Sequence, residues 1–136
     1  MLKVVFDTNV FIPSFFGGIP RQIINCWKNG KITLCFSQEI IEEYIEVLTR
    51  LGLQDKNEIQ NLTKLFAEGY NSIFTAKTPH LEIVEEDPDD NKFIECAVAL
   101  DSKIIISGDK HLLVIKKYID IDIISSKEFI KIWIRE

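Results

Sequence analysis

The stretch LKVVFDTN at residues 2–9 decides the fold, because a mostly apolar run ends there at a carboxylate. Residues 2–6 are β-rich and are followed by polar residues, a pattern that predicts a short buried strand. Asp7 comes directly after that strand. In open parallel sheets, ligands bind in the crevice at the carboxyl ends of the strands. We therefore expect Asp7 to lie at the edge of the sheet where a ligand binds.

Further strands are predicted at residues 31–36, 81–84, 103–106 and 119–124, with helical patterns between them. Short strands that are apolar on both faces and alternate with helices are typical of a parallel sheet covered on both sides. The 136 residues suit one domain, which usually takes roughly 100–200, and no linker or repeat interrupts them. We expect a single α/β domain over residues 1–136, with three α/β/α layers around a mostly parallel sheet.

Cap and stop residues mark where the predicted helices begin and end. A helical turn is also expected over residues 110–115. The predicted starts are Pro20, Ser37, Asp55 (with Glu58 as a capping box), Asp87 followed by Pro88, and Ser125 or Ser126, and the predicted stops are Gly30 and Gly52.

Composition excludes several classes of protein. The net charge of −5 argues against a protein that coats a nucleic-acid duplex, which would carry a basic excess. The apolar runs are shorter than the ~18 residues of a membrane span, and the start of the chain lacks the pattern of a signal peptide. Three cysteines within apolar patterns and two scattered histidines favour buried thiols and no zinc site. We expect an intracellular, cytoplasmic protein.

Two carboxylates follow strands directly. Asp7 ends the first strand, and Asp109 follows the strand at 103–106 across a Ser-Gly turn. If these strands are neighbours, the two carboxylates would repel each other unless a cation lay between them. Each carboxylate alone also has a simpler role, because it can cap the helical turn that follows it.

Two further carboxylates lie on predicted helices. Asp90 precedes Phe93 and Ile94 by three and four residues, so it shares the buried stripe of its helix, whereas Asp89 is rotated away by about 100°. Glu43 falls at the edge of an apolar stripe centred on Tyr44, and Glu46 points further into solvent.

These four carboxylates together suit a hard divalent cation, because no arginine is paired with them in their motifs. Magnesium accepts a few carboxylates and waters and then contacts substrate phosphates. Such an ion turns water into a nucleophile and offsets charge on a phosphodiester. The metal, rather than the acidic protein surface, would then supply the positive field at the substrate.

Four segments of the chain resemble, in order, the acidic motifs of the PIN-domain family. These are DTNVF at residues 7–11, SQEIIEEY at 37–44, DPDDNKFIECA at 87–97 and SGDKHLL at 107–113. The resemblance is closest to the small VapC-like toxin components of toxin–antitoxin pairs. It implies a Rossmann-like α/β/α fold and a ribonuclease that depends on Mg²⁺ or Mn²⁺ and leaves a 5′-phosphate and a 3′-hydroxyl.

The resemblance also assigns residues. It implies that Asp7, Glu43, Asp90 and Asp109 are the catalytic acids, of which Asp7, Asp90 and Asp109 bind the metal. Thr8, Asn9 and Ser107 match the small polar positions, and we assign them to substrate binding. The implied partners are an RNA substrate and a cognate antitoxin, and a homodimer stays open.

The alternatives belong to other classes. A phosphatase of the haloacid dehalogenase type needs a second acid where Asn9 stands, and Asp7 comes too early for a response-regulator receiver. A PIN fold that binds RNA or protein without cutting is the other alternative. Four basic residues near the motifs are candidates for phosphate contacts, although each also fits an ordinary solvated surface: Arg21, Lys92, Lys110 and His111.

Overall fold

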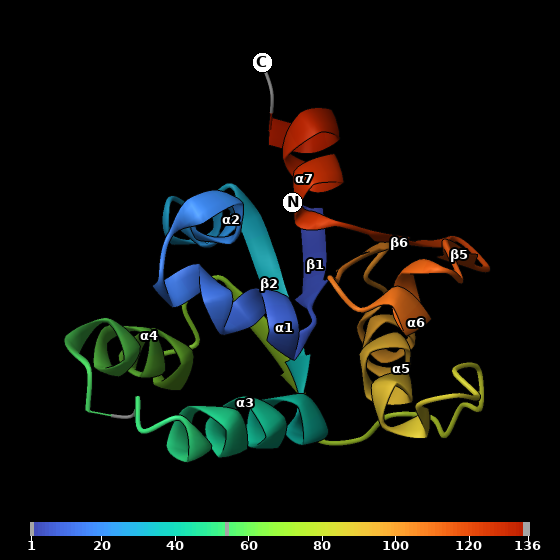
Figure 1. The fold of residues 1–136 in the computed structure, drawn as a ribbon, viewed down its shortest axis with the longest axis horizontal. Helices are drawn as coiled ribbons and strands as arrows, with labels where there is room; N and C mark the ends of the chain where they lie inside the picture. Colours follow the sequence, from blue (N-terminus) through green and yellow to red (C-terminus); the bar gives the residue numbers. More distant parts are fainter. Residues whose placement is uncertain (1, 54, 135–136) are drawn as a thin grey trace.

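A single sheet forms the centre of the molecule, of which a computed structural model describes residues 2–53 and 55–134 (Figure 1). Its six strands within these ranges lie in the order β3-β2-β1-β4-β6-β5, and all neighbours are parallel except β5 and β6. The predicted mostly parallel sheet is therefore confirmed. The strands are β1 (Leu2–Phe6), β2 (Ile32–Ser37), β3 (Ser72–Thr75), β4 (Ile104–Ile106), β5 (Lys117–Tyr118) and β6 (Ile121–Ile124).

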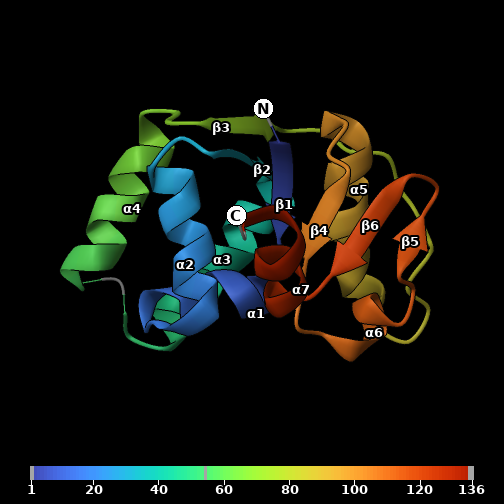
Figure 2. The ribbon, with the colours of Figure 1, turned by 90° about the horizontal axis from the view of Figure 1, so that it is seen from above.

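Helices connect the strands and cover the sheet. The main helices are α2 (Gly18–Lys28), α3 (Gln38–Arg50), α4 (Asn57–Ala67) and α5 (Asn91–Leu100). Helix α5 packs on β1, β2, β3 and β4, whereas α2 packs on β2. The views in Figures 1 and 2 place α2 and α5 on opposite sides of β1. Shorter elements complete the chain: α1 (Thr8–Phe11), η1 (Pro13–Phe15), η2 (Pro88–Asp90), α6 (Lys110–Leu113), α7 (Ser126–Phe129) and the π-helical turn η3 (Ile130–Ile134).

Most of the predicted helix starts are confirmed. Ser37 caps α3 by accepting a hydrogen bond from the Ile40 amide at 3.2 Å, and Ser125 forms a capping box with Glu128. The prediction for α4 is wrong by one residue. Its N-cap is Lys56 rather than Asp55, because the Lys56 carbonyl accepts the first hydrogen bonds of the helix. The side chain of Glu58 lies outside the described part of the structure.

The strand predicted at residues 81–84 is wrong, since this segment contains no strand. Its backbone amides bond to side chains of α5 instead of to a neighbouring strand. The Ile83 and Val84 amides donate to Asn91 Oδ1 at 2.9 and 2.8 Å, and the Leu81 amide donates to Glu95 Oε2 at 2.8 Å. On the side away from β1, β2 pairs with β3, a strand that the sequence did not indicate.

The strand predicted at 119–124 begins later than expected, at Ile121. The residues before it turn back to form β5, which pairs with β6 antiparallel. Ile119 sits in this turn with φ of +56° and is exposed, so the apolar run does not continue the strand.

The core beside β1 fixes the position of α3. The rings of Phe11 and Tyr44 stack with their centroids 4.0 Å apart, and the Tyr44 hydroxyl donates to the carbonyl of Phe6. This contact holds the helix that carries Glu43 against the end of the strand that precedes Asp7. Cys26, Cys35 and Cys96 are buried and free, as expected. Among the described helices, none is both long and apolar enough to cross a membrane.

Candidate metal centre

The candidate site lies where the direction of the chain through the sheet reverses. From β1 the chain moves to β2 and β3 on one side, and β4, β6 and β5 lie on the other. Strands β1 and β4 are parallel neighbours, so Asp7 and Asp109 follow adjacent carboxyl ends. Figure 2 shows β1, β4, β6 and β5 in succession across the sheet. Such a switch point is the usual ligand site of an open parallel sheet.

Ser107 joins Asp7 to Asp109. Its hydroxyl donates to Asp7 Oδ2 at 2.5 Å and accepts from the Asp109 amide at 2.9 Å. Asp7 and Asp109 also cap α1 and α6, accepting from the amides of Asn9 and His111. The capping role expected of each carboxylate is thus real, and it fixes the orientation of both side chains.

Asp7 is buried, with 4% of its surface exposed. Burial disfavours its charged form and raises its pKa from 3.8 to about 6, although hydrogen bonds from Ser107 and Asn9 act in the opposite direction. The nearby charges of Asp109 and Glu43 make smaller contributions to this increase in the Asp7 pKa. The carboxylates predicted to converge therefore lie within electrostatic range of one another.

Asp90 approaches the site from the start of α5. It is buried at 9% exposure, whereas 73% of the Asp89 side chain is exposed, so the helical phase predicted for this pair is confirmed. Burial is the largest cause that raises the Asp90 pKa to about 8, and the neighbouring Asp109 carboxyl contributes to this increase. Within the described residues, Asp90 Oδ2 is buried without a hydrogen-bond partner. A buried carboxylate oxygen without a donor fits a cation that neutralises it.

Four side chains at this end of the sheet can offer one ligand atom each within 4.8 Å of the others: Asp87, Asp90, Asp109 and His111. Asp90 and Asp109 are predicted metal ligands, whereas Asp7 is outside this group and connects to it through Ser107. Three carboxylates and an imidazole are a donor set that binds divalent cations. The residues present therefore fit a metal ion.

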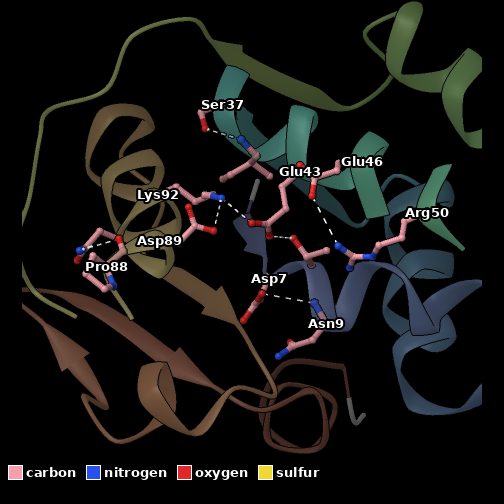
Figure 3. Close-up of polar contacts among 12 residues, drawn as sticks. Asp7, Asn9, Ser37, Glu43, Glu46, Arg50, Pro88, Asp89 and Lys92 are labelled. Atoms are coloured by element: carbon pink, nitrogen blue, oxygen red, sulfur yellow. Dashed lines mark hydrogen bonds and ion pairs between the residues drawn. The ribbon is translucent and has the colours of Figure 1, made fainter. Parts of the chain in front are cut away.

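Glu43 is engaged by other side chains (Figure 3). Lys92 Nζ donates to Glu43 Oε1 at 2.5 Å, and the Thr8 hydroxyl donates to Glu43 Oε2. Lys92 also bonds to Asp89 Oδ2 at 3.1 Å. Burial lowers the Lys92 pKa, but hydrogen bonds to the two carboxylates outweigh that effect and raise it overall. The sequence indicated no basic partner for Glu43, yet its charge is paired by Lys92.

The other predicted contact residues lie in different surroundings. Asn9 is exposed and accepts from the Gly108 amide at 3.0 Å, which joins the loops after β1 and β4. Arg21 donates to the carbonyl oxygens of Ser14 and Phe15. Lys110 is exposed on α6. Ser107 is fully buried, and its hydroxyl hydrogen-bonds to the Asp7 carboxylate and the Asp109 amide.

Sequence reasoning missed two members of the four-residue group. Asp87 was expected only as a cap, and it does occupy the N-cap position of η2, but its side chain makes no capping bond there. His111 was expected only as a phosphate contact. Its position two residues after Asp109, whose carboxylate accepts from its amide at 2.8 Å, is the signal that could have placed it in the group.

Comparison with known proteins gives one family. A search of curated proteins returned no match. The sequence matches the PIN domain family over residues 3–111, a range that includes all four predicted acids and His111. Members of this family are typically metal-dependent nucleases, and the carboxylate group fits such a metal site. This chain belongs to the PIN domain family.

Proposed function

We propose that this protein is a metal-dependent endoribonuclease. The observation that carries the proposal is the meeting of Asp109 and Asp90 at the switch point beside Asp7, with one Asp90 oxygen buried and unpartnered among the described residues. Carboxylates crowded in this way destabilise one another unless a cation binds between them. Mg²⁺ and Mn²⁺ are the ions that such oxygen ligands favour.

Asp7, Asp90 and Asp109 are the proposed metal ligands. A divalent cation held there would activate water and offset the negative charge of a phosphodiester. Ser107 would keep Asp7 and Asp109 in a fixed orientation, because its hydroxyl is bonded to both. Glu43 would complete the acidic pocket from α3, with its orientation set by Lys92 and Thr8.

RNA is the proposed substrate, and the proposed products carry a 5′-phosphate and a 3′-hydroxyl. The acidic net charge means that the backbone phosphates need local cations. Lys110 is exposed next to Asp109 and could contact a neighbouring phosphate from α6. Asn9 is exposed between the loops after β1 and β4 and could contact a sugar or a base.

The test uses the purified full-length chain and a set of single-stranded RNAs with Mg²⁺ or Mn²⁺. Cleavage is expected with metal, and a chelator should stop it. Asp109→Asn should abolish cleavage, whereas Asp122→Asn, a neutralisation in β6, should preserve it. Cleavage that continues in the chelator or in Asp109→Asn would contradict the proposal. RNA binding without cleavage by the wild type would favour the binding module instead.

We also propose that the protein acts in the cytoplasm as the toxin of a toxin–antitoxin pair. The resemblance of the four acidic motifs to those of small VapC-like toxin components supports this role. Production of the wild-type chain in a bacterial host should slow growth, and Asp7→Asn should relieve the effect. Equal growth inhibition by wild type and Asp7→Asn at matched protein levels would contradict a toxin that acts through this site.

A further inference from the structure

We infer that the metal centre contains His111 as a nitrogen ligand and therefore prefers a divalent transition-metal ion to Mg²⁺. This inference rests on the proposed metal centre and adds to it the class of ion that binds. It starts from the group formed by Asp87, Asp90, Asp109 and His111, whose ligand atoms lie within 4.8 Å of one another.

The buried oxygen of Asp90 shows that this group is more than a cluster of surface acids. Asp90 is only 9% exposed, and its Oδ2 has no hydrogen-bond partner among the described residues. Asp87 and Asp109 add further negative charge beside it. A buried carboxylate oxygen with acidic neighbours and no donor is stabilised best by a cation.

The imidazole of His111 is arranged as metal-binding histidines usually are. Nε2 lies 3.1 Å from Glu86 Oε2, and Nδ1 lies 3.6 Å from Asp109 Oδ1. A histidine that binds a metal through one ring nitrogen commonly donates the other N–H to a carboxylate, which fixes the tautomer. Nε2 faces the Glu86 carboxylate, so with the proton on Nε2 the lone pair of Nδ1 is available on the side of Asp109.

A nitrogen ligand changes which ion the site selects. Mg²⁺ binds through oxygen ligands and water, whereas imidazole strengthens the binding of ions such as Co²⁺, Fe²⁺ and Zn²⁺. An all-carboxylate site of Asp7, Asp90 and Asp109 would lack this preference. His111 and Asp87 therefore make the centre of this chain a mixed one, in which His111 determines specificity.

The first measurement is calorimetric titration of the full-length, tag-free protein with Co²⁺ and, separately, with Mg²⁺. His111→Gln, which replaces the ring by an amide, should weaken Co²⁺ binding by about tenfold or more and change Mg²⁺ binding by less than about threefold. His80→Gln is the matched control, because His80 is exposed and pairs with Glu82 outside the group. Equal losses for both ions, or no loss for Co²⁺, would overturn the inference.

The second measurement does not depend on how the His111 variant folds. Pulsed electron paramagnetic resonance of Mn²⁺ bound to the His80→Gln protein should show coupling to a directly bound nitrogen. The coupling should change on selective ¹⁵N labelling of histidine, since His111 is then the one histidine left in the chain. Absence of nitrogen coupling would overturn the inference.

Failure of this inference and failure of the ribonuclease proposal give different results. Nitrogen coupling without RNA cleavage would support the mixed centre and contradict the ribonuclease. RNA cleavage without nitrogen coupling would support the ribonuclease and overturn the mixed centre.

Discussion

Asp90 is the residue that separates a site-specific role from a general need for negative charge. It is buried and contacts the Asp109 carboxyl, whereas its neighbour Asp89 is exposed and pairs with Lys92. Asp90→Asn should reduce RNA cleavage by roughly a hundredfold or more, because loss of a metal ligand impairs both activation of water and charge stabilisation. Single-turnover cleavage rates at saturating metal would measure this loss.

Asp89→Asn is the control for this prediction, since it removes the same charge one residue away. Its effect should be at least about tenfold smaller than that of Asp90→Asn, because the Asp89 side chain is 73% exposed and pairs with Lys92. Equal losses of RNA cleavage in Asp89→Asn and Asp90→Asn would contradict the view that the inward orientation of Asp90 makes it the metal ligand.

Lys92 illustrates how one buried charge constrains another. Its side chain is 8% exposed and bonds to Glu43, which is 22% exposed. Lys92→Met would leave the charge of Glu43 partly buried without its ion-pair partner, so the free energy of unfolding should fall by about 2 kcal/mol in urea titrations. Adding Glu43→Gln should restore part of that loss. A double variant that is less stable than Lys92→Met would contradict this pairing.

At the scale of the elements, the segment before η2 depends on α5 rather than on the sheet. Asn91 accepts from the amides of Ile83 and Val84 and donates to the Pro88 carbonyl at 3.0 Å. Asn91→Ala would leave the buried Val84 amide and the half-buried Ile83 amide without this acceptor, so the free energy of unfolding should fall by about 2 kcal/mol. Hydrogen exchange should accelerate at Ile83 and Val84, which nuclear magnetic resonance can follow residue by residue.

The control is Asn61→Ala on the exposed face of α4. That change should alter the free energy of unfolding by no more than about 0.5 kcal/mol, as is usual for surface substitutions. If the amide hydrogens of Ile83 and Val84 exchanged at the wild-type rate in Asn91→Ala, the hydrogen bonds to Asn91 would not be what protects this segment.

The elements that the sequence predicted well are those that local patterns determine. Helix α3 has Ser37 at its cap and Tyr44 in its buried stripe, and both depend on residues within a few turns. The prediction of a strand at 81–84 was wrong because the amides of this segment donate to the side chains of Asn91 and Glu95, which lie later in the chain. Strand β3 was missed because its pairing with β2 depends on tertiary contacts that four residues of sequence do not encode.

The site shows the same division. Asp7 and Asp109 could be predicted because the end of a strand is visible in the sequence and parallel strands end at one edge. The approach of Asp87 could not, because it depends on how the segment before η2 meets the residues that follow β4. The pairing of Lys92 with Glu43 joins α5 to α3 across 49 positions, which no local pattern contains.

At the scale of the whole molecule, a bound cation should stabilise the fold by relieving repulsion among the carboxylates. At a free concentration about 100 times its dissociation constant, a ligand that binds only the folded state adds about 2.7 kcal/mol to the free energy of unfolding. Differential scanning calorimetry should therefore show a higher melting temperature with Mn²⁺. The increase should be smaller in Asp7→Asn and Asp90→Asn, whereas Asp120→Asn, which lies in a surface ion pair with Lys103, should respond like the wild type.

Without metal, the stability of the molecule should fall as pH rises, opposite to the usual behaviour of salt-bridged carboxylates. Burial raises the pKa of Asp7 from 3.8 to about 6 and that of Asp90 to about 8, so the folded protein keeps protons that the unfolded chain has already released. The stabilisation is then complete below about pH 4 and is lost as pH rises through the folded values. For Asp7 alone the difference is about 3 kcal/mol between about pH 4 and pH 7. Urea titrations of wild type and Asp7→Asn in chelator should converge at low pH, with Asp7→Asn becoming relatively more stable as pH rises. A difference between them that does not change with pH would contradict a raised pKa at Asp7.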